Sequence, residues 1–210
     1  AANMDTVVKH SIGRPADGIV AVCFEKCDST EIADLMFRRL GLAERAKRYH
    51  RFPHTYRWNE YARQFPPPTV RDLLEAKKTG CIVLKFRRCP VARFCSIWKK
   101  YNQSDSGLRD VPLGLTLDEF IQHVATMKLR RYRDDCDPHL ATQRFHNERT
   151  AMWTEVIDVE KLHEPETVDR LRREYGLRVD TTFAARHWVG GDVDLTGDQI
   201  VRIKLMYKGD

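Results

Sequence analysis

Two nearly continuous runs of apolar residues constrain the fold of this chain more than any other feature. Ile19–Phe24 and Cys81–Phe86 lack the polar/apolar alternation of a strand with one wet face, and such runs are typical of strands buried in a parallel sheet. A polar loop and a helical pattern follow each run: Thr30–Leu40 has apolar residues at helical spacing, and Pro90 stands in the first turn of a helix expected to reach Tyr101. The repeated strand–loop–helix unit predicts an α/β fold, with a central, mostly parallel sheet flanked by helices.

Local start and stop signals predict further helices along the chain. A threonine followed three residues later by Glu or Gln forms a capping box, proline favours the first helical turn, and glycine commonly ends a helix. These signals predict helices over residues 70–78, 116–127, 164–176 and 196–206. The sequence has 210 residues and neither an internal repeat nor a low-complexity linker, so we expect a single domain over residues 1–210.

Charge and cysteine content narrow the class of protein only in part. The formal net charge of +6 favours anionic partners, but it does not distinguish nucleic acid, acidic polysaccharide and phosphorylated nucleotide. No apolar run approaches the length that spans a bilayer, and residues 1–13 lack the apolar core of a signal peptide, so we expect any membrane anchor to lie outside this sequence. The cysteines lack the spacing of a zinc site, and we expect most of them to be small buried residues and the protein to need no metal: Cys23, Cys27, Cys81, Cys89, Cys95 and Cys136.

The polar loop after the first apolar run has the features of a phosphate-binding loop. A loop that leads from a parallel strand into a helix presents unpaired backbone N–H groups and the positive end of the helix dipole. Lys26, Ser29 and Thr30 add a cation and two hydroxyl groups there. The nucleotide-triphosphatase pattern GxxxxGK[ST] is absent, since no glycine stands between Phe24 and Arg38. The alternative is that Ser29 and Thr30 only cap the helix while Lys26 is a solvated charge.

The loop after the second apolar run is rich in arginine. Arg87 and Arg88 stand at the carboxyl end of the strand, and Arg93 and Ser96 follow on one face of the helix. The planar guanidinium of arginine matches phosphate oxygens. Ligands of open α/β sheets gather at the carboxyl ends of the strands, so the two loops predict a ligand with phosphates at two places, such as a nucleotide with 5′ and 3′ phosphates. The alternative is a basic surface patch in which Arg93 forms an ion pair.

These two loops resemble the nucleotide-binding motifs of the sulfotransferases that use 3′-phosphoadenosine-5′-phosphosulfate (PAPS). The likeness is greatest to the Golgi carbohydrate branch, which includes the chondroitin and dermatan 4-O-sulfotransferases. Residues 25–32 (EKCDSTEI) are similar to the 5′-phosphosulfate loop of that family, and residues 88–98 (RCPVARFCSIW) resemble its 3′-phosphate motif. Weaker likenesses lie at residues 137–139 (DPH) with Gln143, and at residues 156–162 (VIDVEKL).

The resemblance implies a P-loop-like sulfotransferase fold and transfer of a sulfuryl group from PAPS to a carbohydrate hydroxyl, with adenosine 3′,5′-bisphosphate (PAP) as the product. It assigns Lys26, Ser29 and Thr30 to the 5′-phosphosulfate, and Arg88 and Ser96 to the 3′-phosphate. We expect Cys27, Asp28 and Arg93, which lie within the same two motifs, to contact the donor nucleotide as well. Lys26 is also the cation expected to neutralise the leaving phosphate oxygen. The sequence departs from the family at Glu25, where proline is usual, and at Asp28, whose negative charge lies near the expected anion site.

The resemblance also implies partners and a compartment. It implies a glycan acceptor rather than nucleic acid, a membrane contact only through an anchor outside this sequence, and the Golgi lumen, with the cytoplasm as the alternative.

The stretch between the two loops is the predicted source of the catalytic base. An attacking hydroxyl needs a general base, and we expect His54 first, His50 second and Glu60 third. Aromatic residues alternate with arginines in this stretch, which suits stacking on sugar rings but also suits single-stranded nucleic acid. The predicted acceptor contacts are Arg51, Arg57 and His139.

Three other functions stay open on the sequence. A nucleotide or small-molecule kinase is disfavoured by the missing GK[ST] and by the lack of a clear Mg²⁺ carboxylate after a strand. A nucleic-acid-binding module would use the positive charge and bind oligonucleotides in a salt-dependent manner. A degenerate sulfotransferase fold would bind a nucleotide or glycan without turnover, which Asp28 makes conceivable.

Overall fold

The computed structural model describes residues 3–105, 107–127, 131, 132, 137–182 and 193–210. The chain forms two compact units, which we describe separately: the first comprises Ala1–Arg87 and Asn147–Ala185, and the second comprises Arg88–His146 and Arg186–Asp210. The expected single domain over residues 1–210 stays a prediction, because a division into compact units is not a test of independent folding.

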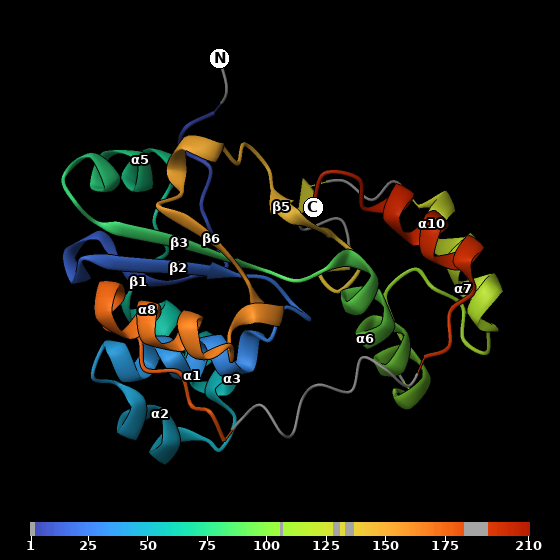
Figure 1. Cartoon of the computed structure of the whole chain (residues 1–210), viewed down its shortest axis with the longest axis horizontal. Helices are drawn as coiled ribbons and strands as arrows, with labels where there is room; N and C mark the ends of the chain where they lie inside the picture. Colours follow the sequence, from blue (N-terminus) through green and yellow to red (C-terminus); the bar gives the residue numbers. More distant parts are fainter. Residues whose placement is uncertain (1–2, 106, 128–130, 133–136, 183–192) are drawn as a thin grey trace. The chain divides into compact units, whose positions relative to one another are not determined.

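A four-stranded, mostly parallel sheet forms the centre of the first unit (Figure 1). Its strands are β1 (Ser11–Arg14), β2 (Ile19–Cys23), β3 (Ile82–Arg87) and β6 (Glu155–Asp158), in the spatial order β1-β2-β3-β6. The pair β1–β2 is antiparallel, whereas the pairs β2–β3 and β3–β6 are parallel. The predicted α/β class with a mostly parallel sheet is therefore confirmed.

β2 and β3 are the two strands that the apolar runs predict. All residues of β2 are buried, and so are residues 83–86 of β3. Cys23, the last residue of β2, pairs with Phe86, one residue before the end of β3. Because the two strands are parallel and aligned in this way, the loops that follow them begin at the same edge of the sheet.

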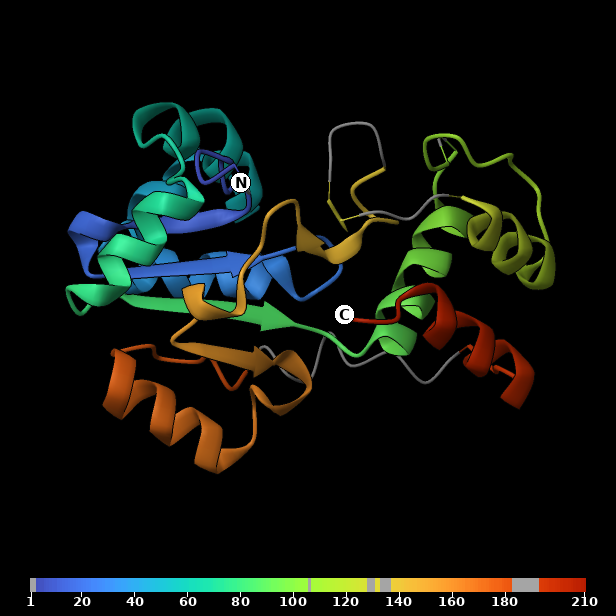
Figure 2. The ribbon, with the colours of Figure 1, turned by 90° about the horizontal axis from the view of Figure 1, so that it is seen from above.

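Helices cover both faces of this sheet. α5 (Val70–Lys78) lies on one face, and α1 (Ser29–Arg39) and α8 (Pro165–Tyr175) lie on the other (Figures 1 and 2). α1 buries the predicted apolar positions Ile32, Leu35 and Met36. α8 begins at its proline and ends at Gly176, whose left-handed backbone (φ 68°) closes the last turn, as the sequence predicts.

The stretch between α1 and α5, for which no sequence pattern predicted a structure, is helical. The rings of Tyr56 and Tyr61 lie 5.2 and 5.4 Å from the ring of Phe37 on α1, so aromatic contacts attach this stretch to the first unit. A single turn of π-helix interrupts the α-helical hydrogen bonds, a feature often found at functional sites. The elements are α2 (Ala43–Tyr49), α3 (Pro53–Tyr56), the π-helical η2 (Arg57–Tyr61) and α4 (Ala62–Gln64).

β1 is an edge strand that the sequence analysis did not predict. Its residue Gly13 has φ 95°, and the N–H of Gly13 donates to the hydroxyl of Tyr61 at 2.8 Å. A Cβ atom at Gly13 would overlap with the backbone carbonyl oxygen of Ile19. Glycine is therefore needed where β1 approaches β2.

Helices dominate the part of the second unit that the structure describes. Pro90 opens α6, and capping boxes of Thr116 with Glu119 and of Thr196 with Gln199 open α7 and α10, as predicted. The core contains a cluster of aromatic rings in which Phe120 lies 5.4 Å from Phe94 and 4.7 Å from Tyr101. The elements are α6 (Pro90–Gln103), α7 (Leu117–Thr126), α10 (Gly197–Met206), and a small sheet of β4 (Arg131–Tyr132) and β5 (Thr142–Phe145).

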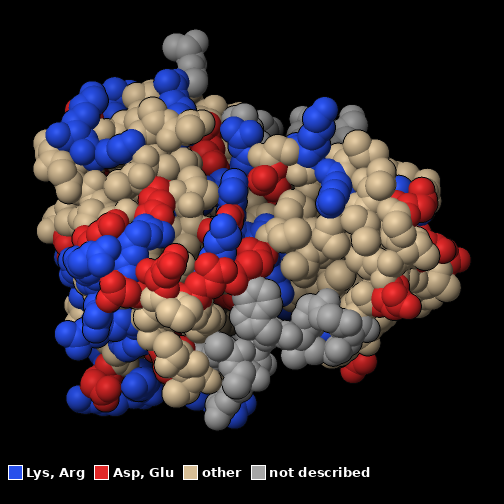
Figure 3. All heavy atoms as spheres, in the orientation of Figure 1, with Lys and Arg blue, Asp and Glu red and all other residues tan. Residues whose placement is uncertain are grey.

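Charged side chains are spread over the surface of the first unit. Basic and acidic groups alternate on the face that Figure 3 shows, so the net charge of +6 is not gathered into one basic patch on this face. Within the described ranges, no helix has both the length and the apolar character that crossing a membrane requires.

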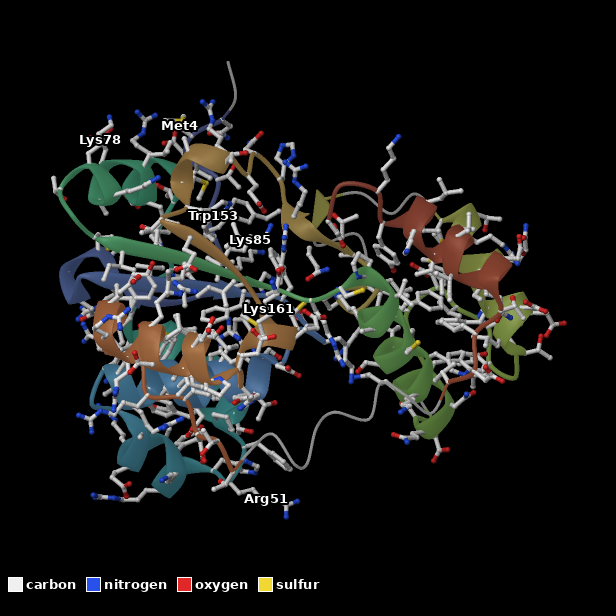
Figure 4. All side chains as sticks on the ribbon, in the orientation of Figure 1. Met4, Arg51, Lys78, Lys85, Trp153 and Lys161 are labelled. Carbon is white, nitrogen blue, oxygen red and sulfur yellow. The ribbon has the colours of Figure 1, made fainter. Side chains whose placement is uncertain are left out.

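An ion pair is buried beside the sheet of the first unit. Lys85 of β3 donates from Nζ to Glu148 Oε1 at 2.6 Å, and the two side chains are 7% and 5% exposed. The ammonium lies 5.6 Å from the ring centroids of both Phe24 and Trp153, and Figure 4 shows Lys85 next to Trp153. The carboxylate and the two aromatic faces together compensate for burial of the cation.

Removing the cation of this pair should destabilise the fold strongly. We expect Lys85→Met to lower the free energy of unfolding by about 3–5 kcal/mol, because the buried carboxylate of Glu148 loses this ion pair. The double variant Lys85→Met/Glu148→Leu should recover much of that loss. Urea denaturation measures both. Lys78→Met is the matched control: its pair with Glu75 at 2.9 Å is 70% and 63% exposed, so its loss should stay below about 1 kcal/mol. Equal losses in Lys85→Met and Lys78→Met would contradict a stabilising buried pair.

Candidate anion-binding site

The loop between β2 and α1 turns through two residues with left-handed backbone. φ is 63° at Lys26 and 53° at Asp28, a conformation that costs roughly 1–2 kcal/mol per residue other than glycine. The N–H of Cys27 donates to the carbonyl of Phe24 at 3.2 Å, and the N–H of Ile32 donates to the carbonyl of Asp28 at 3.0 Å. The surrounding structure therefore holds a strained loop tightly against the start of α1, as is common at functional sites.

The first turn of α1 presents backbone N–H groups at the end of this loop. Asp28 occupies the N-cap position, but its side chain makes no capping hydrogen bond. The first N–H groups of a helix have no partner within the helix and carry the positive end of its dipole. Lys26, Ser29 and Thr30 are half-buried, so a cation and two hydroxyls occur over residues 26–30, where the chain enters the helix N-terminus. This set of groups suits an anion.

Cys27 contributes to the loop through its backbone. It is fully buried, and its carbonyl accepts a hydrogen bond from the thiol of Cys23 at 3.1 Å. Burial raises the pKa of the Cys23 thiol well above its usual range. The Cys23 side chain therefore behaves as a small packed group rather than as a reactive thiolate, and Cys27 is buried beside it.

His54 of α3 contacts both hydroxyls of the loop. Its Nε2 lies 3.2 Å from Ser29 Oγ and 3.1 Å from Thr30 Oγ1. Burial, and secondly the positive charge of Arg57, lower the pKa of His54 to about 4, so the imidazole is neutral at pH 7. Its Nδ1 is buried, and no residue that the structure describes gives this atom a hydrogen-bond partner. The sequence predicted Ser29 and Thr30 as hydroxyls of the loop and His54 separately as a base, and the structure brings His54 into contact with both hydroxyls.

The other predicted residues of this stretch occupy different surroundings. His50 is exposed at the end of α2, where its Nδ1 accepts a hydrogen bond from the N–H of Phe52 at 3.0 Å. Arg51 is exposed and points away from the ribbon (Figure 4), with its guanidinium 4.7 Å from the ring of Phe52. Glu60 is half-buried on η2. These contacts do not identify His50 or Glu60 as the catalytic base.

Arg57 is buried, which does not favour the predicted contact with a sugar. Its side chain is 2% exposed, and its Nη2 donates to the carbonyl of His10 at 2.8 Å. Its guanidinium lies 4.4 Å from the ring centroid of Trp58. The Arg57 side chain is therefore engaged in contacts within the first unit.

In the second unit, a buried glutamine holds the backbone of Arg88. The N–H of Arg88 donates to Gln143 Oε1 at 2.7 Å, and Gln143 Nε2 donates to the carbonyl of Arg88 at 2.7 Å. Gln143 is completely buried, and Arg88 is 8% exposed. The side-chain amide thus satisfies both backbone groups at the point where the chain turns from β3 into α6.

Arg93 and Ser96 lie further along α6, in unlike surroundings. Arg93 is 1% exposed and donates from Nη1 to the carbonyl of Ala141 at 2.7 Å. This burial favours a structural role over the predicted contact with a 3′-phosphate, and it does not fit the alternative in which Arg93 belongs to a basic patch on the surface. Ser96 is half-buried.

His139 belongs to a chain of polar groups that the sequence did not predict as a unit. Its Nδ1 lies 3.0 Å from Asp137 Oδ1, and its Nε2 lies 2.9 Å from Lys100 Nζ on α6. Burial alone would raise the pKa of Asp137, but hydrogen bonds from the His139 side chain and from the N–H groups of Arg109 and His139 outweigh it and hold this pKa at about 2. An ionised Asp137 orients the imidazole and fixes its contact with Lys100.

A second histidine contact at the start of α1 was also missed. His163 Nε2 lies 2.9 Å from Glu31 Oε1, and burial raises the pKa of Glu31. The two residues are 132 positions apart in the chain. No local pattern could have linked them.

Four cysteines are buried as expected, and Cys89 is exposed: the buried ones are Cys23, Cys27, Cys81 and Cys95. Cys136 lies outside the described residues. Where side chains are described, no three of His, Cys, Asp and Glu stand together in a group that could hold a metal ion.

Comparison of the chain with protein-family models, with curated proteins and with solved structures gives no match.

The titration of His54 should leave a signature in the pH dependence of stability. An unfolded histidine has a pKa near 6.5, whereas that of folded His54 is about 4, so folding favours the neutral form. The resulting stabilisation is complete above pH 6.5 and is lost as the pH falls towards 4. Relative to His54→Gln, the wild-type protein should lose about 2 kcal/mol of unfolding free energy between pH 7.5 and 5, measured by urea denaturation. Parallel pH profiles for the two proteins would contradict a buried, neutral His54.

Proposed function

We propose that this protein is a PAPS-dependent sulfotransferase with a P-loop-like fold, which transfers a sulfuryl group to a hydroxyl of a carbohydrate. The observation that carries the proposal is the strained loop between β2 and α1, which combines Lys26, Ser29 and Thr30 with the N-terminus of α1. Its position after a buried parallel strand supports a nucleotide site, because ligands of open α/β sheets bind at the carboxyl ends of the strands.

The chemistry of sulfuryl transfer matches the groups in this loop. In the reaction, the bond from sulfur to the bridging phosphate oxygen breaks while a bond from sulfur to the acceptor oxygen forms, and the acceptor proton passes to a base. Negative charge develops on the leaving phosphate. In the proposal, Lys26 and the N–H groups of α1 stabilise that charge, and the hydroxyls of Ser29 and Thr30 bind the phosphosulfate oxygens.

The arginine-rich motif after β3 is the proposed 3′-phosphate contact. β3 pairs with β2, and Arg88 is the residue that follows β3 directly. The doubly hydrogen-bonded backbone of Arg88 supports this role, because a backbone fixed in advance loses little entropy of its own when a ligand binds. We assign Ser96 to the same phosphate, and we leave Arg93 out of the binding set because its guanidinium donates to the carbonyl of Ala141 and is 1% exposed.

Two exposed aromatic rings support a carbohydrate acceptor. Tyr49 and Phe52, at the end of α2 and before α3, are 44% and 51% exposed, and Arg48 and Arg51 are exposed beside them. Aromatic rings stack on the apolar faces of sugars, and arginines pair with acidic substituents. The same side chains would suit a single-stranded nucleic acid, so an oligonucleotide belongs among the controls.

Isothermal titration with PAP tests the proposed donor site. We expect magnesium-independent binding of PAP that exceeds binding of ATP, and we expect Lys26→Ala and Arg88→Ala each to weaken it by about tenfold to a hundredfold, the range for loss of a charge-assisted hydrogen bond. Lys78→Ala and Arg172→Ala remove exposed cations outside the proposed site and should leave the affinity unchanged.

Other outcomes would favour the rival functions. A preference for Mg–ATP would support a kinase, and salt-dependent oligonucleotide binding without binding of PAP would support a nucleic-acid module. Either result would overturn the proposed function.

A further inference from the structure

The contacts of His54 define which way its neighbouring hydroxyls can point. Nε2 lies almost equally far from two oxygen atoms, at 3.2 Å from Ser29 Oγ and 3.1 Å from Thr30 Oγ1. If Nε2 carries the ring proton, this N–H is shared between the two oxygens, and both hydroxyls act as acceptors towards the ring. If Nε2 is unprotonated, one of the two hydroxyls must donate its hydrogen bond to the ring.

The surroundings of Nδ1 distinguish these two arrangements. Nδ1 is buried, and within the described part of the chain it has no hydrogen-bond partner. A neutral imidazole carries one proton, so a proton absent from Nε2 would make Nδ1 a buried donor without an acceptor. Orphaned buried N–H groups are rarer in proteins than under-satisfied acceptors, and the arrangement with the proton on Nε2 is therefore preferred.

We propose that His54 is a positioning residue, which donates from Nε2 to Ser29 Oγ and Thr30 Oγ1 and so directs both hydroxyl protons at the anion in the loop. This inference rests on the proposed function, because the anion is the phosphosulfate of the donor. It also replaces the predicted role of His54 as general base: a base needs an accessible lone pair, and the lone pair of His54 lies on buried Nδ1.

Arg57 supports this arrangement from the same helical stretch. It follows His54 by three residues, so the two side chains lie on one side of a helix. Its guanidinium is always charged, and it is held by the carbonyl of His10 and the ring of Trp58. A fixed cation beside the imidazole opposes uptake of a second ring proton.

A set of variants at three positions tests the inference through PAP affinity. We expect His54→Ala to weaken PAP binding about tenfold, because the donor that orients the hydroxyls of Ser29 and Thr30 towards the anion is removed. His54→Gln, whose amide N–H reaches the place of Nε2–H, should bind within about threefold of wild type. In a Ser29→Ala/Thr30→Ala background, His54→Ala should cause no further loss, since its effect passes through the two hydroxyls. His146→Gln, at an exposed histidine of the second unit, is the matched control and should leave affinity unchanged.

The outcomes separate this inference from the function on which it rests. If the wild-type protein fails to bind PAP, both the proposed function and the positioning role of His54 are overturned. Wild-type protein that binds PAP, with His54→Ala binding equally well or His54→Gln binding as weakly as His54→Ala, overturns the positioning role alone.

A second measurement does not depend on the folding of any variant. In ¹⁵N NMR of the histidine rings of the wild-type protein at pH 7, assigned by the loss of one signal in His54→Gln, we expect Nε2 to carry the proton and Nδ1 to be unprotonated. A proton on Nδ1 would overturn the inference.

Discussion

The parallel pairing of β2 with β3 is the constraint on which the rest of the first unit depends. Every residue of β2 is buried, so this strand needs a neighbour on each side and cover on each face, which β1, β3, α1 and α5 provide (Figure 2). The register sets Cys23 beside Phe86 and starts both following loops at one edge of the sheet. The strained turn after β2 leads directly into α1. The hydrophobic contacts of this helix with the sheet offset the conformational free energy of the two left-handed residues.

The start of α1 is held from two directions by histidines that come from other elements. His54 of α3 contacts Ser29 and Thr30, and His163 contacts Glu31, so three consecutive side chains of the first helical turn have partners of their own. These contacts limit the rotamers available to the two hydroxyl side chains. Groups that are fixed before a ligand arrives lose less entropy on binding, which supports the proposal of an anion site at this turn.

The sequence predicted those parts of the structure that depend on local pattern. The apolar runs, the capping boxes at Thr116 and Thr196 and the proline and glycine around α8 led to correct elements, because each acts over a few residues. β1 was missed because its four residues, SIGR, form no apolar run, although the strand pairs with β2 across a short turn. Arg57 and Arg93 were assigned to ligands by residue type, whereas long-range hydrogen bonds to His10 and Ala141 make their burial possible. The sequence predicted His54, Ser29 and Thr30 as site residues, but it did not predict the contact between them. That contact depends on the packing of α3 against α1.

Titration of PAP with the protein, followed by ³¹P NMR, tests most directly whether the loop between β2 and α1 binds the 5′ end of the donor. PAP has two phosphates with separate resonances. We expect wild-type protein to shift or broaden both, and Lys26→Ala to reduce the effect on the 5′ resonance while the 3′ resonance is still perturbed. A wild-type protein that leaves both resonances unchanged would contradict the assignment of this loop. So would a Lys26→Ala variant that still perturbs the 5′ resonance as the wild type does and loses its effect on the 3′ resonance alone.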